Sequence, residues 1–489
     1  MSKIGKQGWI ILAGVWLVFA VNGAMILDAD FGWHLRMGEV IVKTGIPSTD
    51  LFSYTMPGYP FVDYEWGTEV LWYKLFPLLG MTGLAAIYAL IAVGAVLIAV
   101  SPREGKMGWA AALLTWSVML SRFGVRVQVV SWLLLAILVR WLWDETVWKK
   151  WRKWYPVLML VWVNLHGSFP LGISIAGMWL VIKTVTERKG DIKSWFWWGS
   201  GIIATFINPY GIRDWAEVIK QMASTGINRG TIAEWAPFYD KLDLGLWALV
   251  AMAVVGWYAV KKVNFARMSV VVGLWLAALW NLRHGPLGAI ALAVAAADSW
   301  ALLKVKVGKN RIAGNRWKGF EKLLLIVSGV IFVGEAVITL TRAVDYERRN
   351  FPVGAVEYLK KNGYPGNAFN KYGWGGYLEW KMPDKKWFID GRMSNWVTDD
   401  SLLGESNWAF KEYLQVLRGE MPVEEVWNKY GIRTVILESR KGFSETKFLL
   451  KWTRQEGGPE EGFDLVKELL SRGWTKVYED NMAVVVEKI

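Results

Sequence analysis

The sequence predicts an α-helical polytopic membrane protein with a C-terminal extracytoplasmic α/β domain. Three observations favour this class. The chain has 489 residues, of which 54% are hydrophobic, and its mean hydropathy is +0.24. Apolar runs of about 20 residues recur along the chain, which is the length needed to cross a bilayer. The 34 Trp residues fit the aromatic belts that membrane proteins place at both interfaces.

The apolar runs predict about 11 transmembrane helices. We expect them at residues 8–26, 82–101, 107–121, 128–145, 155–166, 169–186, 194–207, 244–260, 267–282, 285–304 and 321–341. Lys3 and Lys6 precede the first run, and no small-residue cleavage site follows it. This run is therefore interpreted as a retained first span rather than a removable signal peptide.

The distribution of charge predicts the orientation of the chain. The net charge of +13 is not gathered on one basic face, so it does not indicate a nucleic-acid partner. Basic clusters such as "WKKWRKW" and "ERKGDIK" fall instead in alternate loops, as the positive-inside rule requires of cytoplasmic loops. The N-terminus is then cytoplasmic, the protein is a multi-pass protein of the cytoplasmic (inner or plasma) membrane, and everything after residue 342 is extracytoplasmic.

Two domains are expected. Residues 1–342 form the transmembrane domain, which includes a long first extracytoplasmic loop at 27–81, and residues 343–489 form the α/β domain. In the tail, strand-like runs ("TVILES", "KVYED", "MAVVVEKI") alternate with helical runs ("VGAVEYLKKNG", "FDLVKELLSRG"). The absence of Cys excludes disulfides, thiolate metal ligands and Cys nucleophiles.

The first loop holds ionisable residues directly after the first span. "DFGWHLRMGEVIVK" has helical spacing, with Gly45 as a stop, and Asp30 and His34 lie four apart on one face. A second amphipathic run, "EWGTEVLWYKLFPLLG", is expected to lie along the membrane surface. Asp63 and Glu65 lie between the two helices.

Further ionisable residues are predicted at the same outer face. Ionisable groups near the hydrocarbon cost several kcal/mol unless they are paired or hydrated. Their common placement predicts one shared polar cavity. These residues are His34, Arg122, Arg126, His166, Glu234 and His284.

Each residue also has a structural explanation. Asp28 can be a helix N-cap, which stabilises a helix by about 1 kcal/mol without any chemistry. A His at a Gly-flanked turn is more often a structural hydrogen-bonding group, and Arg122 and Arg126 can extend to lipid headgroups. Asp63 and Glu65 can cap the surface helix. The joint placement of these residues, rather than any single one, favours a site.

The first loop resembles the GT-C superfamily of integral membrane glycosyltransferases. The resemblance rests on the pattern "Asp-x-Asp-x-x-x-His-Leu-Arg-x-Gly…Gly-Ile-Pro-x-x-Asp-x-Phe-Ser-Tyr-Thr…Glu-Trp" directly after the first span. Members of the superfamily use sugars carried on polyprenyl phosphate or pyrophosphate at the non-cytoplasmic face. Their first loop bears an acidic residue near the end of the first span, either a catalytic base or a metal ligand. Asp28 and Asp30 occupy the matching place.

The tail resembles a second region of oligosaccharyltransferases. "NKYGWGGYLEW…KKWFIDGR" is similar to their Trp-Trp-Asp-x-Gly region, which recognises the acceptor peptide, although the acidic residue of that motif is missing here. The alternative is a Gly-rich start of a strand with Trp packed in the core. A second Asp-x-Asp metal pair, found on a later outer loop of oligosaccharyltransferases, has no counterpart in "RFGVRVQ".

The resemblance implies transfer of a sugar from a polyprenyl-phosphate donor to a glycan, lipid or protein acceptor. A carboxylate takes the proton from the acceptor, and Asp30 or Asp28 is expected as this base. Cations neutralise the departing phosphate, and Arg36, Arg122, Arg126 and Arg283 are expected as its partners. A divalent ion (Mg, Mn or Zn) is a candidate cofactor, with Asp30, His166 and Glu234 as candidate ligands. One base without a covalent nucleophile implies inversion. The predicted substrate-binding residues are His34, Arg36, Asp63, Glu65, Arg122, Arg126, His166, Glu234, Arg283, His284, Tyr372, Trp374, Asp390 and Arg392.

Two other classes stay open as alternatives. A transporter also carries ionisable residues in the membrane, but typically near the midplane and with repeat symmetry, which the sequence does not show. A non-catalytic membrane scaffold or sensor with an outer domain leaves the Asp, His and Arg residues without a role. A soluble-type enzyme is not indicated, because no Walker A, His-Glu-x-x-His or Gly-x-Ser-x-Gly pattern occurs.

Overall fold

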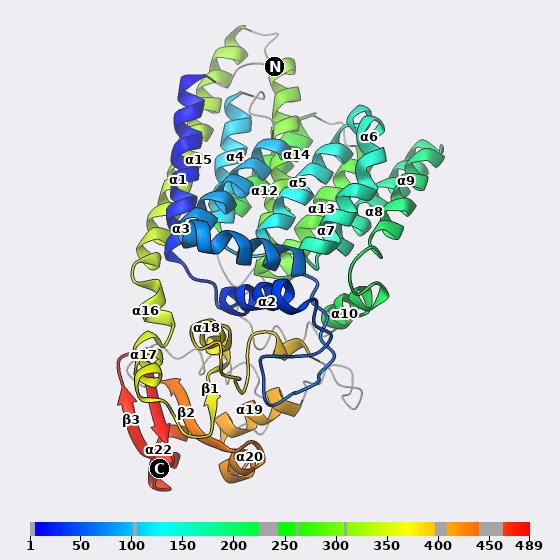
Figure 1. The fold of residues 1–489 in the computed structure, drawn as a ribbon. Coiled ribbons are helices and arrows are strands. Elements are labelled where there is room, and N and C mark those ends of the chain that lie inside the picture. Colours follow the sequence, from blue (N-terminus) through cyan, green and yellow to red (C-terminus); the bar gives the residue numbers. More distant parts are fainter. Residues whose placement is uncertain are drawn as a thin grey trace. The chain divides into compact units, whose positions relative to one another are not determined.

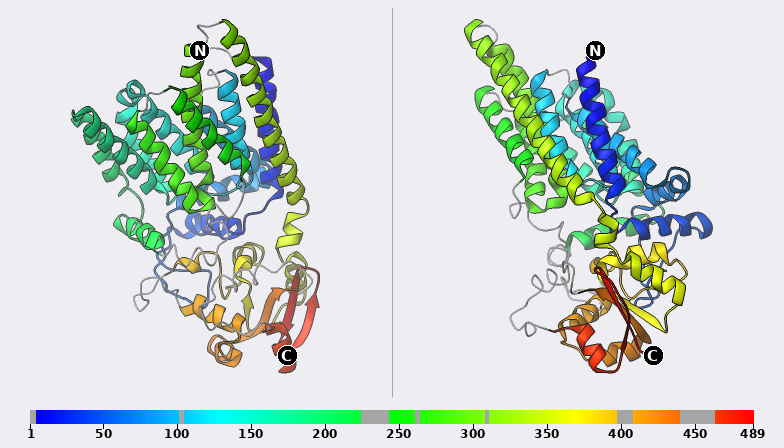
Figure 2. Two further views of the ribbon diagram at one scale, coloured as in Figure 1. Left: turned by 180° about the vertical axis from the view of Figure 1, so that it is seen from behind. Right: turned by 90° about the vertical axis from the view of Figure 1, so that its left-hand side faces the viewer.

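The computed structural model describes residues 5–100, 105–223, 243–260, 264–307, 311–396, 408–439 and 463–489 (Figures 1 and 2). The chain divides into two compact units, which are described separately. The helical unit comprises Met1–Ile26, Leu75–Gly211 and Ala236–Val344. The loop–tail unit comprises Leu27–Lys74, Ile212–Trp235 and Asp345–Ile489.

The helical unit is built from apolar helices joined by short turns. Its elements are α1 (Lys6–Met25), the second part of α3 (Trp66–Ala99), α4 (Lys106–Leu120), α5 (Val129–Trp143), α6 (Glu145–Trp151), η2 (Arg152–Trp154), α7 (Tyr155–Leu165), α8 (Phe169–Glu187), α9 (Ile192–Ala204), α12 (Leu244–Val260), α13 (Phe265–Trp280), η5 (Leu282–His284), α14 (Gly285–Val307) and α15 (Arg311–Ala343). Every apolar run that the sequence analysis expects to span is helical here. The described residues also include α6, a short amphipathic helix inside a predicted basic loop.

Length and composition qualify some of these helices as membrane spans. Within the described residues, five segments are long and apolar enough to cross a bilayer: Lys6–Met25, Trp66–Ala99, Phe169–Glu187, Leu282–Lys304 and Trp317–Ala343. Three shorter apolar helices are Val129–Trp143, Leu244–Val260 and Phe265–Trp280. The total of about 11 crossings and their direction stay predictions.

Small residues let the helices of this unit pack closely. α4 is buried along most of its length, and it packs against α12, α14 and α15. Gly245 at the start of α12 makes one of these contacts possible, because a Cβ there would lie 2.2 Å from the Ser117 hydroxyl of α4. Close approach of helix backbones through small residues is the usual means of helix association in membranes.

The loop–tail unit combines the first loop with the α/β tail. Its elements are α2 (Phe31–Thr44), the first part of α3, α10 (Ile212–Ala223), α16 (Tyr346–Asn350), α17 (Val353–Asn362), β1 (Asn367–Asn370), η6 (Tyr372–Trp374), α18 (Gly375–Lys381), η7 (Met393–Asn395), α19 (Trp408–Arg418), α20 (Val423–Tyr430), β2 (Ile432–Glu438), α22 (Leu465–Ser471), β3 (Thr475–Glu479) and β4 (Ala483–Glu487). The three strands and two helices that the tail's sequence predicts are all present.

The sheet of this unit has four strands in the order β1-β2-β4-β3. β1 pairs with β2 in parallel, while β4 pairs antiparallel with both β2 and β3. The central strands are nearly continuous apolar runs, as expected of strands that are covered on both faces. The sheet and its helices form the α/β domain predicted for the tail, drawn in yellow to red in Figure 2.

The first loop is part of the same hydrophobic core as the tail. Phe52, Met56 and Tyr59 are buried together with Phe388 and Trp396. Two backbone bonds join the segments: the Tyr54 amide donates to the Trp387 carbonyl (3.2 Å), and the Trp387 amide donates to the Phe52 carbonyl (3.0 Å). Residues 27–74 therefore fold with the tail, whereas residues 75–81 of the predicted loop belong to the helical unit.

Glycines bring α2 and α18 into backbone contact. A Cβ on Gly32 would lie 2.0 Å from the Gly376 carbonyl oxygen, and a Cβ on Gly376 would lie 2.7 Å from the Ala29 carbonyl oxygen. The "YGWGG" stretch thus forms η6 and the start of α18. The alternative interpretation, a Gly-rich start of a strand, is wrong for these residues.

The ends of the two loop helices follow from their sequences. α2 ends at Thr44, and Gly45 takes a φ of +92°, which only glycine adopts without strain. This confirms the predicted stop. The second amphipathic run begins α3 at Trp66, and a break at Gly80 separates it from the following apolar span.

Candidate active site

The two aspartates that precede α2 take different roles. The Asp28 Oδ1 atom accepts a bond from the Asp30 amide (3.0 Å), so Asp28 closes the turn that leads into the helix. Asp30 is the residue directly before α2, but its side chain does not cap the helix. Its Oδ1 atom accepts a bond from the Trp33 indole (3.0 Å). Both aspartates are half-buried, so a polar ligand could reach either carboxylate.

The Asp30 carboxylate faces the turn after Asp390. A Cβ on Gly391 would lie 2.2 Å from Asp30 Oδ1, so a larger residue there would have to displace the carboxylate. The Tyr372 hydroxyl lies 2.9 Å from both the Gly391 carbonyl and the Ser394 hydroxyl. Burial raises the pKa of Tyr372, and the Asp30 and Asp390 charges add to this rise. The structure thus brings together Asp30, Asp390 and Tyr372, which the sequence analysis assigned to a site.

A buried ion network lies beside this turn. Arg392 Nη2 lies 2.7 Å from Asp390 Oδ2 and 2.9 Å from Asp50 Oδ1, and all three side chains are buried. Four aromatic rings, those of Trp33, Phe52, Phe61 and Trp396, surround the guanidinium with its carbon 4.9–5.6 Å from each ring centre. This environment ties the first loop to the tail. Asp390 and Arg392 were predicted to bind substrate, which stays a prediction. Their burial in this network shows that they also contribute to the structure.

Trp374 and Glu379 lie near the same network. Trp374 is buried, and its indole donates to the Asn350 carbonyl (2.8 Å). Glu379 on α18 is buried, and burial together with the Asp390 charge raises its pKa well above the usual range. The sequence analysis did not single out Glu379. Glu379 lies in "GGYLEW", on the same short helix as the packed glycines, and nothing in this local sequence predicts that its side chain is buried.

His34 connects α2 to the start of α3. Its Nδ1 atom lies 2.7 Å from Glu69 Oε1, and its Nε2 atom lies 3.7 Å from Glu65 Oε2. The three side chains are buried, and the His34 ring packs on Trp33 with 3.6 Å between ring centres. Asp63 precedes this pair of glutamates, and its Oδ1 atom accepts from the Glu65 amide (3.0 Å). The predicted residues His34, Asp63 and Glu65 are thus neighbours, and Glu69 joins them.

α10 contributes two more carboxylates near Asp63. Asp214 and Glu217 are buried, and Asp214 interacts electrostatically with Asp63. The Gln221 amide donates to the Tyr64 hydroxyl (2.7 Å) on the same side of the helix. Burial raises the pKa of Asp214 to about 7, and the Asp63 and Glu217 charges add to the rise. Burial also raises the pKa values of Asp63 and Glu217.

The acidic residues of α10 were missed by the sequence analysis. A detectable signal was present, since Asp214, Glu217 and Gln221 recur at helical spacing on one face. On the opposite face Ile212, Ile219 and Met222 are exposed. An exposed apolar face with buried carboxylates behind it is the pattern of a helix that lies in a membrane interface. We call His34, Asp63, Glu65, Glu69, Asp214 and Glu217 the acidic cluster.

Arg36 belongs to neither group. It pairs with Glu39 one turn later on α2, and its Nη2 atom donates to the Pro383 carbonyl (3.3 Å). Glu39 also pairs with Lys43 (2.6 Å). Arg36 is therefore part of a charged stripe along α2, and its predicted contact with a phosphate stays a prediction.

In the helical unit, further predicted residues gather around η5. Arg122 donates through Nε to the Leu282 carbonyl and through Nη1 to Asp243, both at 2.9 Å. Arg283 on η5 donates to Gln128 (3.3 Å), and His284 Nδ1 lies 3.3 Å from the Ala277 carbonyl. Arg126 is half-buried in the turn before α5. Arg122, Arg283 and His284 form the η5 cluster.

His166 lies in the same neighbourhood. Its Nδ1 atom lies 3.0 Å from the Ser131 hydroxyl and 2.8 Å from the Ser168 hydroxyl. It is also within electrostatic reach of Arg283 and His284. The structure thus brings four predicted residues of the helical unit, Arg122, His166, Arg283 and His284, to one end of α13 and its neighbours.

The metal prediction stays open. Within the residues that the structure describes, no three His, Asp or Glu side chains form a group suited to hold a metal ion. Asp30 and His166 belong to different units, and Glu234 lies outside the described residues.

Comparison with known proteins supports the fold. No protein-family model and no curated protein matches the chain. Among solved structures, it resembles the apo crystal structure of the oligosaccharyltransferase of Archaeoglobus fulgidus. The TM-score is 0.54 at 14% sequence identity, and the match covers 91% of this chain and 71% of that one. The likeness is one of fold. Together with the apolar helices, it supports a membrane protein whose fold is similar to that of this oligosaccharyltransferase.

Proposed function

We propose that this chain is a membrane glycosyltransferase that moves a sugar from a polyprenyl-phosphate-linked donor to an acceptor at the extracytoplasmic face. The observation that carries the proposal is the oligosaccharyltransferase-like fold along 91% of the chain. The half-buried aspartates after α1 add to it, because an acidic residue at this place is what the resemblance of the first loop implies.

Asp30 is the better candidate for the base. Asp28 Oδ1 is engaged in the turn that precedes α2, whereas the Asp30 carboxylate is held from the side by the Trp33 indole. A hydrogen bond from Trp33 fixes the orientation of the carboxylate, which is what a general base requires. In the proposed reaction Asp30 takes the proton of the acceptor hydroxyl or amide as the acceptor atom attacks C1. The bond between C1 and the phosphate oxygen breaks, and inversion at C1 follows.

The departing polyprenyl phosphate requires cations. Arg283 is the best candidate in the helical unit, because it is half-buried and its hydrogen bond to Gln128 is long at 3.3 Å. Arg122 is more strongly engaged, since Asp243 accepts from it at 2.9 Å. Electrostatic stabilisation of developing charge typically contributes several kcal/mol to catalysis.

The test is a transfer assay with the purified full-length protein in vesicles. A panel of labelled polyprenyl-phosphate sugars is supplied, and release of the free carrier phosphate is measured. The wild type is expected to release carrier from at least one donor. Asp30→Asn is expected to abolish release while donor binding is kept, and Asp384→Asn, which removes an exposed carboxylate of the same unit, is expected to have no effect.

Two outcomes contradict parts of the proposal. Full activity of Asp30→Asn means that the base assignment is wrong, and Asp28→Asn then becomes the decisive variant. No release from any donor by a folded sample contradicts glycosyl transfer from these carriers and favours a non-catalytic membrane scaffold.

A further inference from the structure

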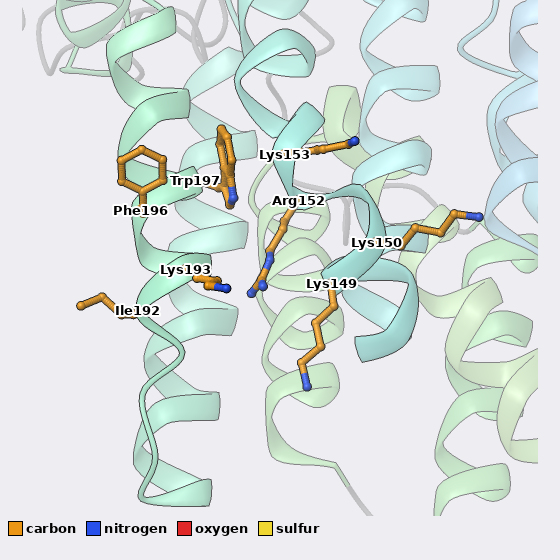
Figure 3. Close-up of a pocket in the computed structure, with 8 residues that line it drawn as sticks. All are labelled: Lys149, Lys150, Arg152, Lys153, Ile192, Lys193, Phe196 and Trp197. Atoms are coloured by element: carbon orange, nitrogen blue, oxygen red, sulfur yellow. The ribbon is translucent and has the colours of Figure 1, made fainter.

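A basic cavity lies at one end of the helical unit, apart from the η5 cluster. It has a volume of about 520 Å³ and is enclosed by α6, η2 and the first turns of α9 (Figure 3). The residues that line it are Lys149, Lys150, Arg152, Lys153, Ile192, Lys193, Phe196 and Trp197. Five of these eight side chains are cationic.

The acidic side chains around the cavity neutralise only some of these charges. Glu145 lies 2.7 Å from Lys149 and is shared with Lys183, which itself also pairs with Glu187. Asp191 pairs with Arg152. Within the described residues, no ion pair is formed by Lys150, Lys153 or Lys193. The cavity therefore has an excess of positive charge.

The cationic side chains that line the cavity point in different directions. Figure 3 shows Arg152 and Lys193 extending toward each other across the space between η2 and α9, with Lys149 below them, whereas Lys150 and Lys153 point away from α9. The Arg152 Nη1 atom donates to the Ser194 hydroxyl (3.0 Å) and pairs with Asp191 (2.5 Å), which fixes the guanidinium plane. A held guanidinium opposite a free ammonium is suited to a phosphate group.

The outer wall of the cavity is apolar. Ile192 and Phe196, which are 82% and 63% exposed, stand beside Lys193 on α9, and the Trp197 ring lies within the lining. Apolar side chains that are exposed next to cations are typical of the zone where lipid headgroups meet acyl chains. A soluble anion would contact only the cationic side chains, whereas a lipid would also contact the apolar wall.

The cavity also lies at the end of the helical unit where anionic lipid is expected. α6 and the start of α1 are at the same end of this unit in Figures 1 and 2. The positive-inside pattern predicts that this end is cytoplasmic, and the cytoplasmic leaflet carries the negative surface potential. We propose that this cavity binds the headgroup phosphate of an anionic phospholipid, with Arg152 and Lys193 as its ligands.

The proposal is tested by lipid-dependent stability of the full-length protein in nanodiscs. Unfolding temperatures are measured in discs of phosphatidylglycerol and in discs of phosphatidylcholine. The wild type is expected to gain stability in phosphatidylglycerol. Lys193→Gln is expected to lose at least half of this gain, and its unfolding temperature in phosphatidylcholine should be unchanged. Lys150→Gln removes the same charge from a side chain that points away from α9 and is expected to keep the gain.

The remaining outcomes overturn the proposal. An equal gain for the wild type and Lys193→Gln means that the cavity is not the site. Equal losses for Lys193→Gln and Lys150→Gln mean that diffuse surface charge, not a built site, attracts the lipid. In a second experiment, millimolar inorganic phosphate is added to the protein in phosphatidylcholine discs. If phosphate raises the unfolding temperature as much as phosphatidylglycerol does, the cavity binds free phosphate instead of lipid. Native mass spectrometry should show retained anionic lipid on the wild type and less on Lys193→Gln.

Discussion

Arg392 of the tail and Asp50 of the first loop, 342 positions apart, meet in a buried ion pair with 2.9 Å between Nη2 and Oδ1. Asp390 and four aromatic rings complete the environment of the guanidinium. The pair therefore makes the first loop dependent on the tail for its structure, and it gives the first prediction.

Arg392→Gln should strongly destabilise the loop–tail unit. Removing one partner of a buried pair leaves an uncompensated charge, which costs about 3–5 kcal/mol. The free energy of unfolding is measured by denaturant titration of the detergent-solubilised protein. Arg472→Gln is the control, because Arg472 forms an exposed pair with Glu468 whose contribution is at most about 1 kcal/mol. Equal losses for the two variants would show that the Arg392 network contributes little.

Gly32→Ala should disrupt the contact between α2 and α18. The new methyl group would lie 2.0 Å from the Gly376 carbonyl oxygen, and a backbone atom cannot move aside as the end of a side chain can. A loss of about 1–3 kcal/mol is expected from such overpacking. Limited proteolysis of the first loop measures the effect. Gly14→Ala, on α1 with open space around its Cβ, should leave the cleavage pattern unchanged.

The stability of the loop–tail unit should fall as the pH rises from about 4 to about 7. Burial raises the pKa of Asp214 from 3.8 to about 7, so the folded state holds this proton where the unfolded state has released it. Stability from this group is complete below the unfolded pKa and is lost as the pH approaches the folded pKa, at about 1.4 kcal/mol per pH unit. Asp63 and Glu217 face Asp214 and shift in the same direction.

Unfolding temperatures at pH 5 and pH 8 check this dependence. Asp214→Asn should flatten the difference between the two values, because an amide does not titrate. Glu425→Gln, an exposed carboxyl change on α20, should retain the wild-type difference. A wild type that is more stable at pH 8 than at pH 5 contradicts the assignment.

Gly391→Ala should reduce catalysis more than substrate binding, if Asp30 is the base. The added methyl group would lie 2.2 Å from Asp30 Oδ1 and must push the carboxylate aside. A displacement of about 1 Å at a reacting group can lower a rate about 100-fold. We expect kcat to fall with KM little changed, as measured by carrier release in vesicles. Gly94→Ala, which has open space on α3, should keep both constants. A rise in KM alone would mean that Gly391 shapes substrate binding instead.

The exposed face of α10 should contact lipid. Because the chain has no Cys, single spin labels can be placed through Ile219→Cys and Met222→Cys without removing native thiols. Both labels should be more accessible to molecular oxygen than to a water-soluble nickel complex, since oxygen concentrates in the acyl region. Lys220→Cys on the adjacent face should show the reverse order. Identical accessibility at all three positions would exclude a lipid-facing surface.

The sequence was sufficient for the local elements because their signals are local. Apolar runs predicted the long apolar helices of the helical unit, although not α6, and strand-like runs predicted β2, β3 and β4 of the tail. Asp30, His34, Asp63 and Glu65 could be singled out because they are close together in the first loop, and their part in a site stays a prediction. The likeness to an oligosaccharyltransferase fold supports the expected architecture.

The rest depends on contacts between distant segments. Asp50 belongs to the pattern quoted for the first loop, but only the fold places it against Arg392. Asp390 was expected to contact substrate, and this stays a prediction; its place in the same buried network could not be read from the sequence. The acidic face of α10 was overlooked because no helix was predicted between the expected spans 194–207 and 244–260. The helical spacing of its acidic residues was nevertheless visible in the sequence.

The distance along the chain between Asp50 and Arg392 sets an order of events during synthesis. Ribosomes add roughly 5–20 residues per second, so the first loop emerges about 20–70 s before its partner arginine exists. During that interval the tail residues that bury Phe52, Met56 and Tyr59 have not yet been synthesised. The newborn loop is then a target for chaperones and proteases, and a cell that slows translation of the later helices would lengthen its exposure.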